Sequence, residues 1–198
     1  MARIELRGET VVIDGYVNVT GRDSRPIPDG NGGYFLEQIE KGAFQKAIER
    51  AEEVKILLNH DWNKVLGSTK DNLTLKEDVI GLRAHALITD PEVVQKAKDK
   101  RLRGWSFGFY KPTETRSEAS NGMTVRKITD LNIKEVSLID QNMRPWYDST
   151  TVEMRGEGDT EEIEQRAEEF EADYIGFEEK KPDNSKLKAI IEKLGGTV

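Results

Sequence analysis

The chain has 198 residues, a formal net charge of −7, no cysteine and two histidines. This length fits one domain of ordinary size with an appendage, and the lack of cysteine excludes a disulfide scaffold, a thiolate zinc site and a cysteine nucleophile. No window approaches the roughly 18 apolar residues that cross a bilayer, and the first ten residues lack the apolar core of a signal peptide. We therefore expect a soluble, unexported protein with no membrane partner.

The negative charge is concentrated at the C-terminal end. Residues 156–198 contain 13 acidic and 6 basic residues, so residues 1–155 carry equal numbers of both. A neutral body with an acidic tail offers no positive surface to phosphate backbones, and we expect no direct binding of nucleic acid. The composition predicts two parts: a folded domain over 1–155, and a solvated, mobile or partner-binding tail over 156–198.

The first half of the chain mixes strand and helix patterns. β-Branched and aromatic residues over 10–20 predict a strand or a strand pair, and the Gly, Pro, Asp and Asn residues of 21–33 predict a loop. Apolar residues at three- and four-residue steps over 35–53 predict one helix, or two short helices that meet at Gly42. The short apolar run 54–58 predicts a further strand.

The second half continues the mixture. Strands are predicted over 72–76, 81–88, 104–110 and 123–139, with a tight turn between the first two. A helix is predicted over 91–101, with Asp90 as its N-cap and Pro91 at its first position, and the polar residues 111–122 predict a loop. About six short strands with two helices favour an α+β domain built on a mainly antiparallel sheet or a small barrel.

The tail contains few large apolar residues, and those near Ile163 and Phe170 predict a weak helix. Ser185 can cap a better-defined amphipathic helix over 186–194, which Gly195 and its neighbour end. A short amphipathic helix on an acidic tether favours docking or autoprocessing, with packing against the body as the alternative.

Without cysteine, the two imidazoles are the natural general bases near neutral pH. His60 directly follows a strand that is predicted to be buried, and catalytic side chains are often located at such strand ends. A structural histidine that only forms hydrogen bonds fits the same pattern. His85 lies within Gly81–Ile88, where alternation predicts a partly exposed strand residue.

Ser106 is the candidate nucleophile, in Gly104-Trp105-Ser106-Phe107-Gly108-Phe109. Glycines two residues away on either side permit close approach of another backbone, so that a substrate carbonyl can reach the serine hydroxyl. The plain alternative is an ordinary strand serine beside glycines that relieve crowding. A strand follows rather than a helix, so this is not the GxSxG nucleophile elbow.

Glu135 is the candidate third residue, because strand alternation places it on one face with isoleucines. A buried carboxylate needs a partner, and that partner is either a histidine, as in a Ser-His-acid triad, or the cation of an ordinary ion pair.

Five short motifs occur in an order and spacing that resemble the tailed-phage prohead maturation proteases. They are Glu37-x-x-x-Lys41-Gly42-Ala43-Phe44, Leu57-Leu58-Asn59-His60-Asp61 with Val65-Leu66-Gly67, Gly81-Leu82, Gly104-Trp105-Ser106-Phe107-Gly108-Phe109, and Glu135-Val136-Ser137-Leu138-Ile139. The resemblance covers about residues 4–155. This family is related to the herpesvirus assemblin serine peptidases, so the resemblance implies a small, mainly antiparallel β-barrel flanked by helices, with the nucleophile and the base on neighbouring strands.

The resemblance implies that Ser106 is the nucleophile and His60 the general base. The assemblin relatives use a second histidine as third residue and the phage members an acid from this strand, so Glu135 is favoured and His85 is the fallback. The chain departs from the family after Ile139, where a Val-Xaa-Xaa-Pro-Ala pattern is replaced by residues 140–145. This departure leaves the local loop and its substrate contacts open.

The implied function is a serine endopeptidase that needs no metal or cofactor and processes the capsid and scaffold proteins of a phage prohead. The implied partners are the major capsid protein precursor with its scaffold segment and the chain itself, by self-cleavage within 150–185 and as a possible homo-oligomer. The implied place is the host cytoplasm, inside the assembling procapsid. The rival is a catalytically silent, protease-like scaffolding protein, and a weaker alternative is a host-encoded β-barrel interaction module.

Overall fold

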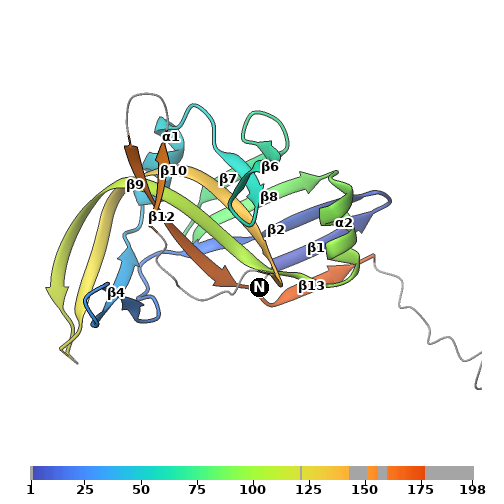
Figure 1. The fold of residues 1–198 in the computed structure, drawn as a ribbon. Helices are drawn as coiled ribbons and strands as arrows, with labels where there is room; N and C mark the ends of the chain where they lie inside the picture. Colours follow the sequence, from blue (N-terminus) through green and yellow to red (C-terminus); the bar gives the residue numbers. More distant parts are fainter. Residues whose placement is uncertain (1, 121, 143–150, 156–159, 177–198) are drawn as a thin grey trace, which may run out of the picture.

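The computed structural model of the protein describes residues 2–120, 122–142, 151–155 and 160–176, whose strands form two sheets (Figure 1). The five-stranded sheet has the order β13 (Ala172–Ile175), β1 (Ala2–Arg7), β2 (Thr10–Val19), β8 (Gly81–Ile88) and β7 (Leu73–Glu77). All its strands pair antiparallel except β13, which runs parallel to β1.

The eight-stranded sheet contains the candidate site. Its path is β11 (Thr151–Arg155), β12 (Thr160–Glu169), β9 (Leu102–Glu118), β10 (Thr124–Asp140), β4 (Tyr34–Ile39) and β3 (Ile27–Pro28), while β5 (Lys55–Leu58) pairs with both β10 and β6 (Asp61–Ser68). The helices are α1 (Ala43–Arg50) and α2 (Pro91–Lys98). The α+β class is confirmed, but the described strands do not close into a barrel, and the predicted small barrel is unconfirmed.

Along one of its edges, β10 pairs in parallel with two strands, one after the other. Residues 124–128 pair with β4, and residues 135–138 pair with β5. Helix α1 connects β4 to β5, and Phe44 of this helix is fully buried with its ring edge-on to Phe107 of β9, at 5.2 Å between centroids. The crossover therefore brings the end of β5, and with it His60, to the part of β10 that contains Glu135.

The predicted helix over 35–53 is wrong in its first half. Residues 34–39 form β4, because pairing with β10 satisfies their backbone groups and overrides the local periodicity. Gly42 separates the strand from α1 with φ 87°, a left-handed conformation that glycine adopts without steric cost.

Most other expectations for the body are confirmed. The strands predicted over 10–20, 54–58, 72–76 and 81–88 correspond to β2, β5, β7 and β8. The carboxylate of Asp90 accepts hydrogen bonds from the backbone N–H groups of Glu92 and Val93, as expected for the N-cap of α2. Strand β6 and the N-terminal strand β1 were not predicted.

The predicted loop over 111–122 is wrong, because β9 continues to Glu118. Most of β9 beyond residue 110 is exposed, and its end pairs with residues 124–128 of β10, which pair in turn with β4 (Figure 1). The exposed residues of this part of β9 need no apolar alternation, so the sequence reads as a polar loop.

The first part of the predicted tail joins the sheets. The weak helix expected near Ile163 and Phe170 is wrong, because 160–169 form β12 on β9 and 172–175 form β13 on β1. The division of the chain at residue 155 stays a prediction, and the helix over 186–194 lies outside the described residues.

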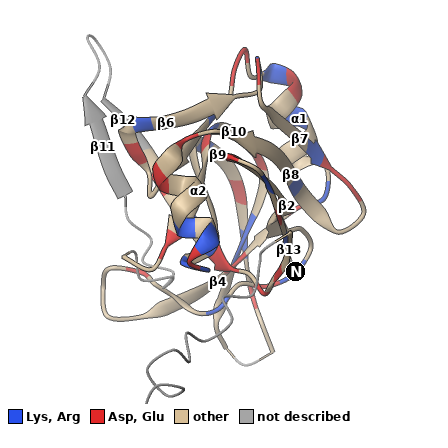
Figure 2. Ribbon diagram, turned by 90° about the vertical axis from the view of Figure 1, so that its right-hand side faces the viewer, with Lys and Arg blue, Asp and Glu red and all other residues tan. Residues whose placement is uncertain are grey.

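Helix α2 is tied to the end of β10 by charge. Figure 2 shows basic segments on this helix, and Lys96 places its Nζ 2.8 Å from the buried carboxylate of Asp140. Burial raises the pKa of Asp140, but the charge and hydrogen bond of Lys96 together with hydrogen bonds from Asn142 and Asn59 outweigh it, and the pKa lies below the ordinary value. Neither α1 nor α2 is long and apolar enough to cross a membrane, and the described residues contain no other helix.

Candidate active site

The sheet register places the candidate residues together on one face. Strands β9 and β10 pair antiparallel, with Ser106 opposite Ser137 and Gly108 opposite Glu135. Residues that lie opposite each other in a ladder project to the same side, so Ser106 and Glu135 share a face. Strand β5 pairs with the other edge of β10 and leads directly into His60.

A tight turn after β5 fixes the position of His60. Asn59 and His60 have φ of 54° and 60°, a conformation that is uncommon outside glycine. Strand β10 holds this turn through three hydrogen bonds: Asn59 N to Leu138 O (2.8 Å), His60 N to Ser137 Oγ (3.2 Å) and Asp140 N to Asn59 Oδ1 (3.0 Å). Backbone strain held in place by its surroundings is typical of functional sites.

His60 and Glu135 form a buried pair. Nδ1 of His60 lies 2.8 Å from Oε1 of Glu135, and the two side chains are only 7% and 2% exposed. Ser137 donates its hydroxyl to the other carboxylate oxygen of Glu135, at 2.6 Å. Because an ionised carboxylate only accepts, a neutral imidazole in this position would donate from Nδ1 to Glu135 and leave Nε2 as the basic nitrogen.

Ser106 is fully buried, and its hydroxyl has a different partner. It donates to the backbone carbonyl of Arg166 in β12, at 2.7 Å, and Ala167 lies opposite it in the ladder. Among the described residues no hydrogen bond joins Ser106 to His60. The structure therefore brings His60 and Glu135 into contact and places Ser106 on the same face of the sheet, with its hydroxyl held by β12.

The two glycines that flank Ser106 permit close contacts, as the sequence predicts. A Cβ on Gly104 would lie 2.1 Å from the carbonyl oxygen of Glu168 in β12, and a Cβ on Gly108 would lie 2.6 Å from Oε1 of Glu135. Gly104 thus admits a neighbouring backbone, and Gly108 admits the carboxylate that holds His60.

His85 lies away from this group, in β8 of the five-stranded sheet. Its Nδ1 is 3.0 Å from Oδ2 of Asp14, its side chain is 54% exposed, and Arg83 shares the same carboxylate. The structure does not bring the fallback third residue to Ser106 and His60.

Two contacts at the site were missed from the sequence. Alternation places Ser137 on the face of Glu135, and that pattern was the available signal for its hydrogen bond. Nothing in the local sequence indicates that the carbonyl of Arg166 meets Ser106, because that contact joins residues 60 positions apart.

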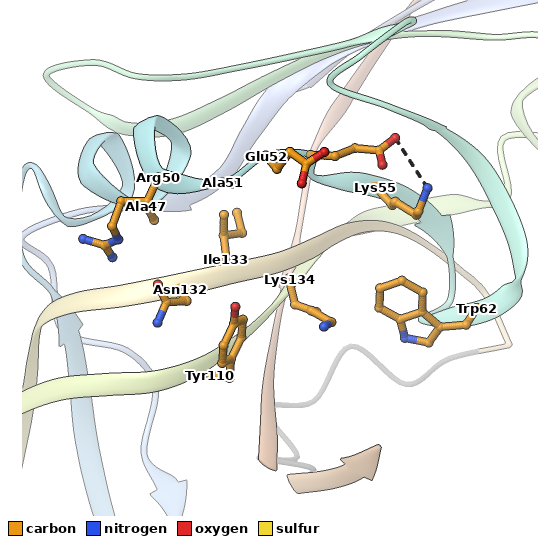
Figure 3. A pocket seen from close by; sticks show the side chains of 11 residues that line it. Ala47, Arg50, Ala51, Glu52, Lys55, Trp62, Tyr110, Asn132, Ile133 and Lys134 are labelled. Carbon is orange, nitrogen blue, oxygen red and sulfur yellow. Dashed lines mark ion pairs between the residues drawn. The ribbon is translucent and has the colours of Figure 1, made fainter. Parts of the chain in front are cut away.

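A pocket of about 390 Å³ lies beside the site (Figure 3). Its lining includes Tyr110 and Asn132, which face each other across β9 and β10, Trp62 of β6, and Lys134, the neighbour of Glu135. Lys55, which also lines the pocket, lies opposite Glu135 in the ladder between β5 and β10. Its side chain forms an ion pair with Glu53, which is drawn as a dashed line in Figure 3. The pocket thus shares β9 and β10 with the candidate residues, although Ser106, His60 and Glu135 are not part of its lining.

The family model described as caudovirus prohead serine protease matches residues 2–166. Neither a curated protein nor a solved structure matches the chain.

Proposed function

Because the chain belongs to the caudovirus prohead serine protease family, we propose that it is an active serine endopeptidase that processes the capsid and scaffold proteins of a phage prohead, and also itself. The observation that carries this proposal is the buried pair of His60 and Glu135 on the face of Ser106. A carboxylate that holds one ring nitrogen of an imidazole is the arrangement that activates a serine.

In the proposed mechanism, Ser106 is the nucleophile. Its hydroxyl turns from the carbonyl of Arg166 toward Nε2 of His60, which takes the proton as Oγ attacks the scissile carbonyl. Glu135 keeps the ring in the required tautomer and stabilises the imidazolium that forms. His60 then gives its proton to the leaving amine, and water activated by the same imidazole hydrolyses the acyl ester and releases Ser106.

The family points to a protease that acts in the assembling procapsid. We propose that its substrates are the major capsid protein precursor with its scaffold segment, other proteins of the immature shell, and the segment 150–185 of the chain itself. A homo-oligomer and location in the host cytoplasm belong to the same proposal.

One observation favours a second function. Ser106 is fully buried and its hydroxyl is bonded to Arg166, as expected of a catalytically silent scaffolding protein. If the chain is a protease, either the hydrogen bond between Ser106 and Arg166 breaks before catalysis, or Arg166 occupies the place of a substrate residue. The buried histidine–carboxylate pair favours the protease, because it lies on the face of Ser106 and has the arrangement that activates a serine.

Co-expression with the cognate capsid precursor tests the proposal. We expect the wild-type chain to shorten the precursor, and the Ser106→Ala and His60→Ala variants to leave it intact. Equal shortening by all three proteins would show that the residue assignment is wrong. An intact precursor in every case, with normal assembly of shells, would favour the scaffolding protein.

A further inference from the structure

Strand β12 lies where a protease would place its substrate. It pairs antiparallel with the outer edge of β9, from Glu164 opposite Phe109 to Glu169 opposite Gly104, and so passes directly beside Ser106. Addition of an extended segment to the edge of a sheet is a common mode of peptide recognition, because the ladder supplies affinity and the side chains supply specificity.

One peptide group of β12 is presented to the nucleophile. The carbonyl of Arg166 accepts the hydroxyl of Ser106 at 2.7 Å, and Gly104 lets the backbone of Glu168 approach to a distance that any side chain would prevent. Ser106 is fully buried beneath this arrangement. No other peptide can reach the nucleophile while β12 occupies the edge of β9.

The side chain of Arg166 fills an acidic site on the body. Its Nε lies 2.7 Å from Oε1 of Glu37 in β4, its Nη2 lies 2.8 Å from Oε2, and its guanidinium lies 5.3 Å from the ring centroid of Phe109. Burial lowers the pKa of Arg166, but the charges of Glu37 and Glu164 outweigh this effect and raise it. A planar fork on one carboxylate is the geometry that distinguishes arginine from lysine.

The acid two residues earlier is held in the same way. Glu164 accepts two hydrogen bonds from the guanidinium of Arg126 in β10, at 2.5 and 2.8 Å. Arg126 also donates to Glu37 at 3.0 Å and to Glu114. Arg116 also pairs with Glu114, so the body contributes two carboxylates and two guanidinium groups, and β12 adds one of each in Glu164 and Arg166. The acid of the β12 segment thus meets an arginine of the body, and its arginine meets Glu37.

We propose that the outer edge of β9 is the substrate groove, that β12 occupies it as a substrate strand, and that Glu37 selects an arginine whose carbonyl accepts the hydroxyl of Ser106. Arg126 selects an acid two residues before that arginine. The substrates are therefore extended segments of the type Glu-x-Arg followed by a small residue, as in 164–167. This inference rests on the proposed protease function and adds to it a sequence preference.

Two peptides test the preference directly on the full chain. One is a quenched fluorescent peptide with the sequence of residues 160–171, and its twin has citrulline, which is neutral but nearly the same shape, in place of arginine. We expect the wild-type chain to cut the first peptide after its arginine and to show a kcat/KM on the order of 100-fold lower for the twin. Glu37→Gln is expected to bring the two values close together, and Ser106→Ala supplies the background.

A second comparison tests the occupancy of the groove by β12. We expect Arg166→Ala to lower the KM for the arginine peptide about tenfold at similar kcat, because the chain's own strand then competes less well. Arg7→Ala is the matched control, since this exposed arginine of β1 lies in the five-stranded sheet and bonds to Glu5 of its own strand. A permanent structural strand would instead give an Arg166→Ala variant with a lower kcat and an unchanged or higher KM.

The outcomes separate the groove from the protease function. Equal turnover of the two peptides by the wild-type chain, or cleavage at another bond, would overturn the groove. So would cleavage of the capsid precursor by a chain that cuts neither peptide, and in that case the protease function would stand. If neither the wild type nor Arg166→Ala cuts any substrate, the protease function fails and the groove fails with it.

Discussion

Substitution of Gly108 by alanine should disable the site although it replaces none of the three proposed catalytic residues. The added methyl would lie 2.6 Å from Oε1 of Glu135, whereas ordinary contact begins near 3.4 Å, so the carboxylate must retreat by about 0.8 Å. The bond to His60 now measures 2.8 Å, and a displacement along its direction would stretch it to about 3.6 Å, which is no longer a hydrogen bond. A misplacement of this size costs about 100-fold in kcat, or roughly 2.7 kcal/mol in the barrier.

The assay measures the rate at which the variant shortens the capsid precursor when the precursor is supplied at a saturating concentration. Melting followed by circular dichroism shows whether the variant is folded. The new methyl would also lie 3.2 Å from Cγ2 of Ile163 in β12, so the loss must be assigned to the correct contact. The double variant Gly108→Ala with Ile163→Ala removes that second contact. We expect it to remain as slow as the single variant.

A folded Gly108→Ala protein with wild-type kcat, or recovery of kcat in the double variant, would refute this role of Gly108. The first result would mean that the carboxylate is not confined above Gly108 in the working enzyme. Glu135→Gln then distinguishes the causes, because loss of the orienting acid is expected to lower kcat by on the order of 10⁴-fold whatever happens at Gly108.

Three further predictions concern other contacts. Ser137→Ala removes the hydroxyl that is bonded to Glu135, and steady-state kinetics should show kcat lower by about 10-fold with KM unchanged, whereas a change confined to KM would contradict this positioning role. The lowered pKa of Asp140 adds stability that is complete above its unfolded pKa of about 3.9 and disappears as the pH falls through its folded value. Denaturant unfolding between pH 7 and 2 should therefore show a smaller acid loss of free energy for Asp140→Asn than for wild type, and parallel pH curves would show that this carboxylate does not contribute to the loss. If self-cleavage follows the geometry of β12, it should leave a new C-terminus at Arg166. Intact mass spectrometry would show this product in the wild type, and the Ser106→Ala variant should lack it. A cut elsewhere in 150–185 would argue against that geometry.

Local patterns were sufficient where local interactions decide the structure. The hairpin of β7 and β8 follows from alternation on either side of a polar turn. Helix α2 begins where Asp90 supplies acceptors for the first free N–H groups, and this cap needs no distant partner. Ser106, His60 and Glu135 were selected by residue type, by their places on strands and by motif resemblance.

Pairing with distant strands decided the elements that local patterns misread. Residues 35–39 have helical spacing but form a strand, because β10 supplies their partners about 90 positions later in the sequence. Residues 160–169 lack the apolar alternation of a buried strand, yet β12 docks through Arg166, whose charge is neutralised by Glu37. Such ion pairs join residues that no local window contains.

For the site, the sequence by itself determined the residue types and the strands that bear them, because a base, a hydroxyl and an acid are chemical identities. Only the tertiary structure decided that Glu135 bonds to His60, that His85 pairs with Asp14 on another sheet, and that the hydroxyl of Ser106 meets the chain's own β12. The reason is that each of these contacts depends on register between strands, and a shift of one residue would turn every side chain to the opposite face.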